Sequence, residues 1–143
     1  MTARVPPEFD AFLAEPRDAI LCIAREPGRA PHATPVWFDY VDGVFRVSIT
    51  RARVKYRLLL AAPQVTLVVD DGPTLRTVIV SGEAEIRDDD ASLLALSREL
   101  RAKHGSGLDP DGPPDDELLR SLREEQRVVV VIRPEHALSW AGG

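Results

Sequence analysis

The clearest periodic pattern along the chain is the alternation of apolar and polar side chains over Val44–Thr50. Apolar Phe45, Val47 and Ile49 alternate there with residues that are mostly polar. A period of two predicts a β-strand with one buried face. The next run, Val54–Ala61, predicts a short helix, because a proline follows two residues later.

The remaining apolar runs predict five further strands and three further helices. Strands are expected at Ala19–Arg25, His32–Tyr40, Val65–Val69, Val78–Ile86 and Val128–Ile132. Helices are expected near Phe9–Leu13, along the leucine stripe Leu93–Leu100, which follows three aspartates, and at Glu117–Gln126. A Gly- and Pro-rich stretch at 105–114 predicts a loop, and the chain finishes with an apolar segment near Trp140.

Short turns at Glu26–Arg29, Val41–Gly43 and Asp70–Pro73 join neighbouring strands, which favours an antiparallel sheet. Six short strands with peripheral helices predict an α+β fold around a closed or partly closed β-barrel, since closure removes exposed strand edges. The 143 residues contain no repeat or interdomain linker, so we expect one domain over residues 1–143.

Composition narrows the functional classes. The chain is 44% hydrophobic and 29% charged, which is ordinary for a globular protein. No apolar run approaches the roughly 20 residues of a membrane span, and no positively charged leader precedes an apolar core. The single cysteine, Cys22, lies in an apolar run and is expected to be a buried, reduced side chain. These features predict a cytoplasmic protein without a membrane partner.

The charge is unevenly distributed. The net charge of −5 divides into +2 over residues 1–60, with nine basic and seven acidic groups, and −7 over residues 61–143, with nine and sixteen. Four cations gather at Arg51, Arg53, Lys55 and Arg57, and no acid lies between residues 42 and 70. One basic patch on an acidic chain disfavours nucleic-acid binding, which draws on extended positive surfaces. A small anionic ligand fits better.

The arrangement around Thr50 matches what a phosphate requires. A strand ends at this hydroxyl, the cationic turn follows, and the predicted helix then offers its N-terminal N–H groups and dipole. Arginine and lysine add charge-assisted hydrogen bonds to an anion. The alternative is a solvated basic turn, because charged runs usually lie at the surface.

Several short motifs occur together in a familiar order. They are Pro35-Val36-Trp37-Phe38, a Gly43 turn, Thr50, Arg53-x-Lys55, Pro63-x-Val65, a strand containing Gly82, and a terminal Val-rich region ending at Trp140. In this order and spacing the chain resembles the pyridoxamine 5′-phosphate oxidase-like split-barrel family. Within that family it is similar to small actinobacterial members that use the deazaflavin coenzyme F420.

The resemblance implies a homodimer of six-stranded split barrels, with flavin or deazaflavin sites at the dimer interface. It assigns the cofactor phosphate to Thr50, Arg53 and Lys55. It places Pro35, Val36 and Trp37 beside the ring system, largely through their backbone. The activity implied is an F420- or FMN-dependent oxidoreductase that transfers a hydride between the cofactor and a small conjugated substrate.

The chain also departs from the family pattern. Leu58, Ala62 and Gln64 stand where many relatives have Asn, Asp and Arg, which leaves the cofactor open between F420 and FMN. Arg51 and Arg57 favour F420, because its oligoglutamate tail is acidic. An FMN-binding relative of pyridoxamine 5′-phosphate oxidase and a non-catalytic cofactor-binding or storage protein remain alternatives. The segment 88–126 is expected to cover one end of the substrate pocket.

Other chemistry-bearing residues give weaker signals. Trp37 is either a core residue or a wall of the cofactor site, and Trp140 is expected to be a packing or dimer-contact residue. His32 is expected to be a solvent-accessible turn residue. His104 and His136 have no acid or cysteine at a metal-ligand spacing, so no metal site is predicted.

Overall fold

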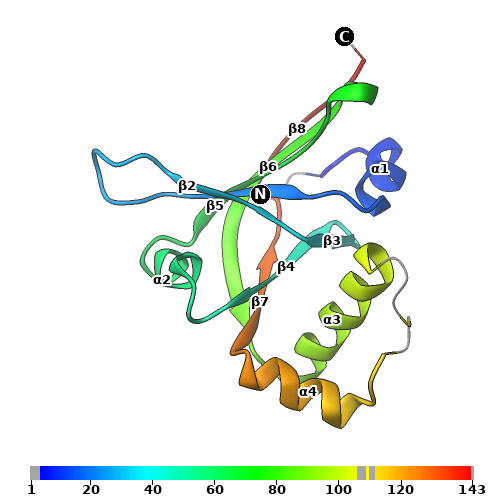
Figure 1. Cartoon of the computed structure of the whole chain (residues 1–143). Helices are drawn as coiled ribbons and strands as arrows, with labels where there is room; N and C mark the ends of the chain where they lie inside the picture. The colour runs from blue at the N-terminus through cyan, green and yellow to red at the C-terminus, as the bar shows by residue number, and fades with distance from the viewer. Residues whose placement is uncertain (1–3, 106–108, 110–111, 143) are drawn as a thin grey trace.

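The computed structural model describes residues 4–105, 109 and 112–142, and these form a curled, antiparallel sheet with four α-helices around it (Figure 1). The strands are β1 (Ala19–Ile23), β2 (His32–Val36), β3 (Phe38–Val41), β4 (Val44–Thr50), β5 (Gln64–Asp71), β6 (Arg76–Arg87), β7 (Arg127–Ile132) and β8 (His136–Ala141). The helices are α1 (Asp10–Ala14), α2 (Val54–Ala61), α3 (Asp90–His104) and α4 (Asp115–Glu124). The predicted α+β split barrel is therefore confirmed.

The two ends of the sheet are consecutive in the chain. The strand order is β2-β1-β5-β6-β7-β4-β3, and β8 pairs with the first half of β6. Only Trp37 separates β2 from β3, so the chain itself connects one end of the sheet to the other. β3 pairs with β4 only as far as Val47, and β2 pairs only with β1. Among the described residues, the end of β4 and the outer edge of β2 therefore border a split in the barrel.

The predicted number of six strands is wrong, because the described part of the chain contains eight. The predicted strand His32–Tyr40 breaks at Trp37, where the chain leaves β1 and joins β4. β8 is the other addition, formed by the terminal apolar segment. The turn predicted at Asp70–Pro73 also lies later, because β5 continues through Asp71 and the reversal occurs at Gly72–Thr74.

Local signals set the helices accurately. α2 has the predicted bounds, and the side chain of Asp89 caps α3 by accepting a hydrogen bond from Ser92 N at 3.0 Å. α4 begins two residues earlier than predicted, with three acids in its first turn, where the helix dipole favours negative charge. The predicted loop at 105–114 falls partly outside the described residues, so its conformation is not described.

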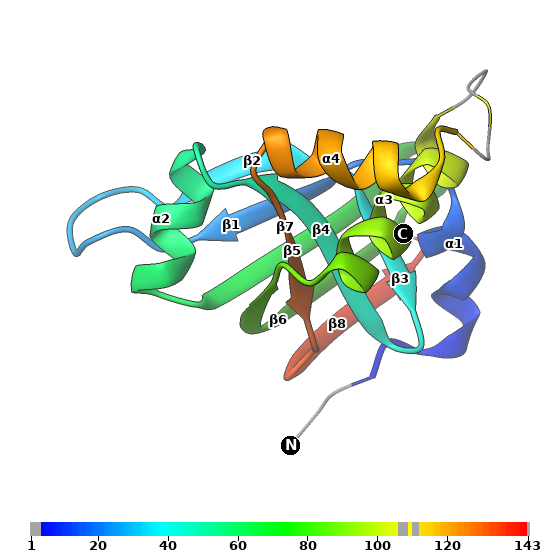
Figure 2. The ribbon, with the colours of Figure 1, turned by 90° about the horizontal axis from the view of Figure 1, so that it is seen from below.

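The sheet has cores on both faces. Phe12, Phe38 and Phe45 are among the side chains that fill the barrel interior. A second core lies between α3, α4 and the outer face of β7, where Val129 and Val131 pack against leucines of both helices. β7 is thus buried on both faces, and Figure 2 shows α3 and α4 lying together over this side of the sheet. This second core fixes the position of the helices relative to the split.

Gly82 is required by a close backbone approach rather than by a turn. It lies in β6 beside the chain that leaves β7, and a Cβ at this position would lie 2.3 Å from the backbone oxygen of Arg133. Real Cβ atoms do not approach an oxygen so closely, so any other residue forces the backbone of β6 or of Arg133 to move.

Candidate functional site

A cleft of about 440 Å³ occupies the split between β2, the end of β4 and the start of α2. Six of the seven residues predicted to bind the cofactor line this cleft. They are Pro35, Val36, Trp37, Thr50, Arg53 and Lys55. The fold brings them together because β2 runs up to Trp37 beside the end of β4 that β3 leaves unpaired, and α2 begins soon after β4 ends.

The electrostatic character of the cleft is cationic. Its charged lining residues are Arg53, Lys55 and Arg127, and no aspartate or glutamate is among the described residues that line it. Nζ of Lys55 donates a hydrogen bond to Oγ1 of Thr34 at 3.0 Å. Burial, and then the charge of Arg53, lower the pKa of Lys55 below its usual value. A bound anion would offset both effects, so the ammonium group is placed for an anionic ligand.

The N-terminus of α2 also favours an anionic ligand. Arg53 is the N-cap, no side chain caps the first turn, and that turn contains no acid. The N–H of Arg53 bonds to the carbonyl oxygen of Thr50 at 3.1 Å, which turns the chain tightly from strand to helix. An eight-residue helix with uncapped N–H groups and adjacent cations is suited to binding a phosphate.

His32 lies in the cleft, contrary to the expectation of a turn residue. It begins β2 and lines the cleft, and its Nδ1 is buried without a hydrogen-bond partner among the described residues. Burial, followed by the charges of Arg25 and Lys55, lowers its pKa. An unsatisfied buried nitrogen costs about 1–3 kcal/mol, which a ligand group in the cleft could recover.

Arg51 is the one predicted site residue that does not line the cleft. Its Nη2 lies 2.8 Å from Oδ2 of Asp88, and its guanidinium lies 5.9 Å from the ring centre of Tyr56. Arg57 is exposed on α2 and does not line the cleft either. The cationic cluster of the sequence is therefore divided between the cleft and the surface.

Besides His32, three polar lining residues were not anticipated from the sequence. Thr34 accepts the hydrogen bond from Lys55, while Ser48 and Arg127 lie on the paired strands β4 and β7. Ser48 could have been found, because the alternation of β4 places it on the opposite face from buried Val47 and Ile49. Arg127 pairs with Thr50 across β4 and β7, and no local pattern predicts this long-range register.

Trp37 is not a core residue. Its side chain is 49% exposed, and its ring stacks on that of His104 with centroids 4.7 Å apart and planes 7° apart. Nε2 of His104 lies 3.4 Å from the backbone oxygen of Phe38, which holds the imidazole beside the crossing point of the sheet. Burial lowers the pKa of His104, so the stacked imidazole favours its neutral form. The end of α3 therefore braces the indole that borders the split.

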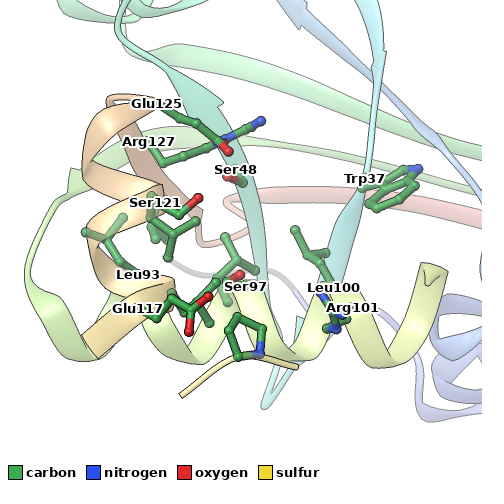
Figure 3. Close-up of a pocket in the computed structure, with 15 residues that line it drawn as sticks. Trp37, Ser48, Leu93, Ser97, Leu100, Arg101, Glu117, Ser121, Glu125 and Arg127 are labelled. Atoms are coloured by element: carbon green, nitrogen blue, oxygen red, sulfur yellow. The ribbon is translucent and has the colours of Figure 1, made fainter. Parts of the chain in front are cut away.

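A second cleft, of about 610 Å³, lies between α3, α4 and the outer face of β4 and β7. Trp37, Ser48 and Arg127 line both clefts, so the two are adjacent. Figure 3 shows Ser48 and Arg127 between α4 and Trp37. A third opening, of about 950 Å³ near Tyr40 and Pro134, contains none of the predicted site residues.

Three other observations bear on the function. Among the described residues, no group of three His, Cys, Asp or Glu side chains is arranged to hold a metal ion. None of the described helices combines the length and apolar composition of a membrane span. Cys22 is half-buried on the outward face of β1, so the prediction of a buried cysteine is only partly correct.

Comparisons with known proteins agree with the fold. The sequence matches the family description "Pyridoxamine 5′-phosphate oxidase" over residues 5–141. A solved F420 reductase is 29% identical, with a TM-score of 0.71, over 94% of this chain and 98% of that one. A conserved hypothetical protein from Mycobacterium tuberculosis is 25% identical, with a TM-score of 0.77, over 98% and 86% of the two chains. A haem storage protein from Vibrio cholerae shares the fold at 18% identity, with a TM-score of 0.68 over 97% and 95%. No match was found among curated proteins.

Proposed function

Because the chain belongs to the pyridoxamine 5′-phosphate oxidase family, we propose that it is a flavin- or deazaflavin-dependent oxidoreductase with coenzyme F420 as its cofactor. The observation that carries this proposal is the acid-free, cationic cleft at the split of the barrel, bordered by an exposed indole. FMN is the alternative cofactor. The similarity to an F420 reductase supports the choice of F420.

In this proposal the phosphate binds at Thr50, Arg53 and Lys55. The hydroxyl and the first N–H groups of α2 donate hydrogen bonds, and the two cations add charge-assisted ones. The ring system lies along β2 at Pro35, Val36 and Trp37, where the outer edge of β2 pairs with no strand of the described residues. His32 Nδ1 is the additional polar group available to the ligand.

The chemistry comes from the cofactor, which when bound exchanges a hydride with a small conjugated substrate while water supplies or accepts the proton. The chain then needs only to bind, orient and shield the reacting groups. This division of labour explains why the described cleft functions without a carboxylate acid or base. Trp37, held by its stack on His104, keeps one face of the reaction space apolar.

We also propose that the protein is a homodimer. Its support is a row of apolar side chains that crosses five paired strands on the outward face of the sheet. The row consists of Pro35, Ile20, Val68, Ile79 and Leu138, each directly opposite the next. Pro35 belongs both to this row and to the cleft, so a second copy packed on the row would lie beside the cofactor.

Titration with F420 and with FMN tests the proposed function. We expect saturable binding, followed by fluorescence, with one cofactor per chain and tighter binding of F420. Turnover is then assayed with reduced F420 and an enone or nitro compound. Absence of binding by either cofactor would refute the proposal. Tight binding without turnover across such substrates would favour the alternative of a cofactor-binding or storage protein.

A further inference from the structure

The cleft between α3 and α4 has the dimensions of a ligand site. Its volume of about 610 Å³ falls within the range of small-molecule sites, about 300–1,000 Å³. We propose that this cleft binds the substrate, an uncharged apolar compound of two or three rings whose reacting end lies at Trp37 and whose hydrogen-bond donor faces Glu117. This inference rests on the proposed function and adds the class of its substrate.

The floor of the cleft is apolar. Leu93, Leu96 and Leu100 of α3, Leu122 of α4 and Val129 of β7 are among the buried residues that hold the two helices on the sheet, and they also line the cleft. Leu118 is only partly buried and extends this surface along α4. A ring system that packs on this floor removes apolar surface of both the ligand and the protein from water. This burial is the main driving force for binding here.

The polar groups at the rim favour a ligand without charge. Arg127 donates from Nε to Oε2 of Glu125 at 2.8 Å, and Arg101 donates from Nε to the backbone oxygen of Asp109 at 2.6 Å. Both cations are therefore engaged by the protein. Glu117 adds a carboxylate, which accepts hydrogen bonds and repels anions. A hydrogen-bond donor on the ligand would pair with this carboxylate, whereas an anionic ligand would be repelled by it.

The positions of the two clefts indicate which end of the ligand faces the cofactor. In Figure 3, Glu117 and Ser121 of α4 and Ser97 of α3 lie on one side of the cleft, and Trp37 lies on the other. The cofactor cleft begins at Trp37 and Ser48. A rigid compound of two or three rings that rests on the leucines therefore extends from Glu117 to the indole.

The first test uses the protein without cofactor and the fluorescent probe N-phenyl-1-naphthylamine, an uncharged compound with three aromatic rings and one N–H donor. Ser97→Phe fills the cleft from α3. Ala95→Phe adds the same ring to an exposed position of that helix outside the cleft lining, and serves as its matched control. We expect the wild type and Ala95→Phe to bind the probe equally. Ser97→Phe should bind at least about tenfold more weakly, because one ring of the probe loses its apolar site.

A second blocking variant guards against misfolding. Ser121→Phe closes the cleft from α4, and Arg120→Phe is its control on the same helix. Circular dichroism checks that each variant is folded. The proposal is overturned if the wild type does not bind the probe, or if a folded blocking variant binds it as tightly as its control.

The second test examines charge selection with 1-anilinonaphthalene-8-sulfonate, which carries the same rings and a sulfonate. The wild type should prefer the uncharged probe. Glu117→Gln should reduce that preference by about fivefold, because a carboxylate acceptor becomes a neutral one, whereas Glu99→Gln, an exposed change on α3, should not. An unchanged preference in Glu117→Gln would contradict the assigned role of that carboxylate.

Cofactor titration of the same variants separates the two proposals. If Ser97→Phe loses the probe but keeps wild-type affinity for F420 or FMN, both proposals stand. If neither cofactor binds the wild type while the probe still does, the proposed function fails and the cleft remains a ligand site. If cofactor binds normally and the blocking variants retain the probe, the substrate inference fails alone.

Discussion

Replacement of Lys55 by methionine isolates the interaction on which the phosphate assignment depends. The substitution keeps most of the apolar length of the side chain and removes one half-buried ammonium group, whose present partner is Thr34 Oγ1 at 3.0 Å. A hydrogen bond to a charged group contributes about 1.5–3 kcal/mol, so the cofactor should bind roughly 10- to 150-fold more weakly. The loss should be larger than that of Arg53→Met, because Arg53 is exposed and its charge is screened by solvent.

The assay is a fluorescence titration of F420 and FMN at low and at physiological ionic strength. Arg29→Met is the control, since it removes an equal charge from the hairpin between β1 and β2, where Arg29 pairs with Glu26. The wild type should also lose affinity as the pH rises through the depressed pKa of Lys55, because only the protonated amine attracts phosphate. This alkaline limb should be absent in Lys55→Met. Equal dissociation constants for Lys55→Met, Arg29→Met and the wild type would refute the assignment.

Four further predictions follow from individual contacts. Arg51→Met should change cofactor affinity less than about twofold, because this guanidinium is paired with Asp88. A loss of affinity as large as that of Lys55→Met would show that Arg51 contacts the cofactor. Leu138→Glu should give a monomer by light scattering, because it places a charge on a side chain that is 59% exposed in the apolar row; a dimer of unchanged stability would exclude that face. Gly82→Ala should lower the free energy of unfolding by about 1–3 kcal/mol in urea titrations, because its Cβ overlaps the oxygen of Arg133. Burial lowers the pKa of Lys103 to about 8, so its folded form releases a proton that the unfolded chain keeps up to about pH 10.5; stability should therefore rise with pH across this window in the wild type and rise less in Lys103→Met.

Local patterns were sufficient for the elements that carry the proposed phosphate site. β4 and α2 have their predicted bounds, because strict alternation defines the strand and a nearby proline limits the helix. Thr50, Arg53 and Lys55 lie in this one strand–helix unit, so their proximity needs no information on tertiary structure.

The structure differs from the expectations where distant segments decide the outcome. Strand propensity is continuous through Trp37. β2 ends there only because the chain stops pairing with β1 and, as β3, begins to pair with β4. Arg51 belongs to the same local cluster as Arg53, yet Asp88, 37 positions away, engages its guanidinium. Arg127 enters the cleft only through the register of β7 against β4. Such pairings depend on how the whole sheet is assembled and leave no periodic signal in the sequence.

The most direct test of the central claim is a crystal structure of the protein with FMN or F420 bound. In that complex the cofactor phosphate should lie within about 3.2 Å of Thr50 Oγ1, of the Arg53 guanidinium and of Lys55 Nζ, with the ring system beside Trp37. A cofactor phosphate bound elsewhere, without contact to Arg53 or Lys55, would show that this strand–helix turn is not the phosphate site.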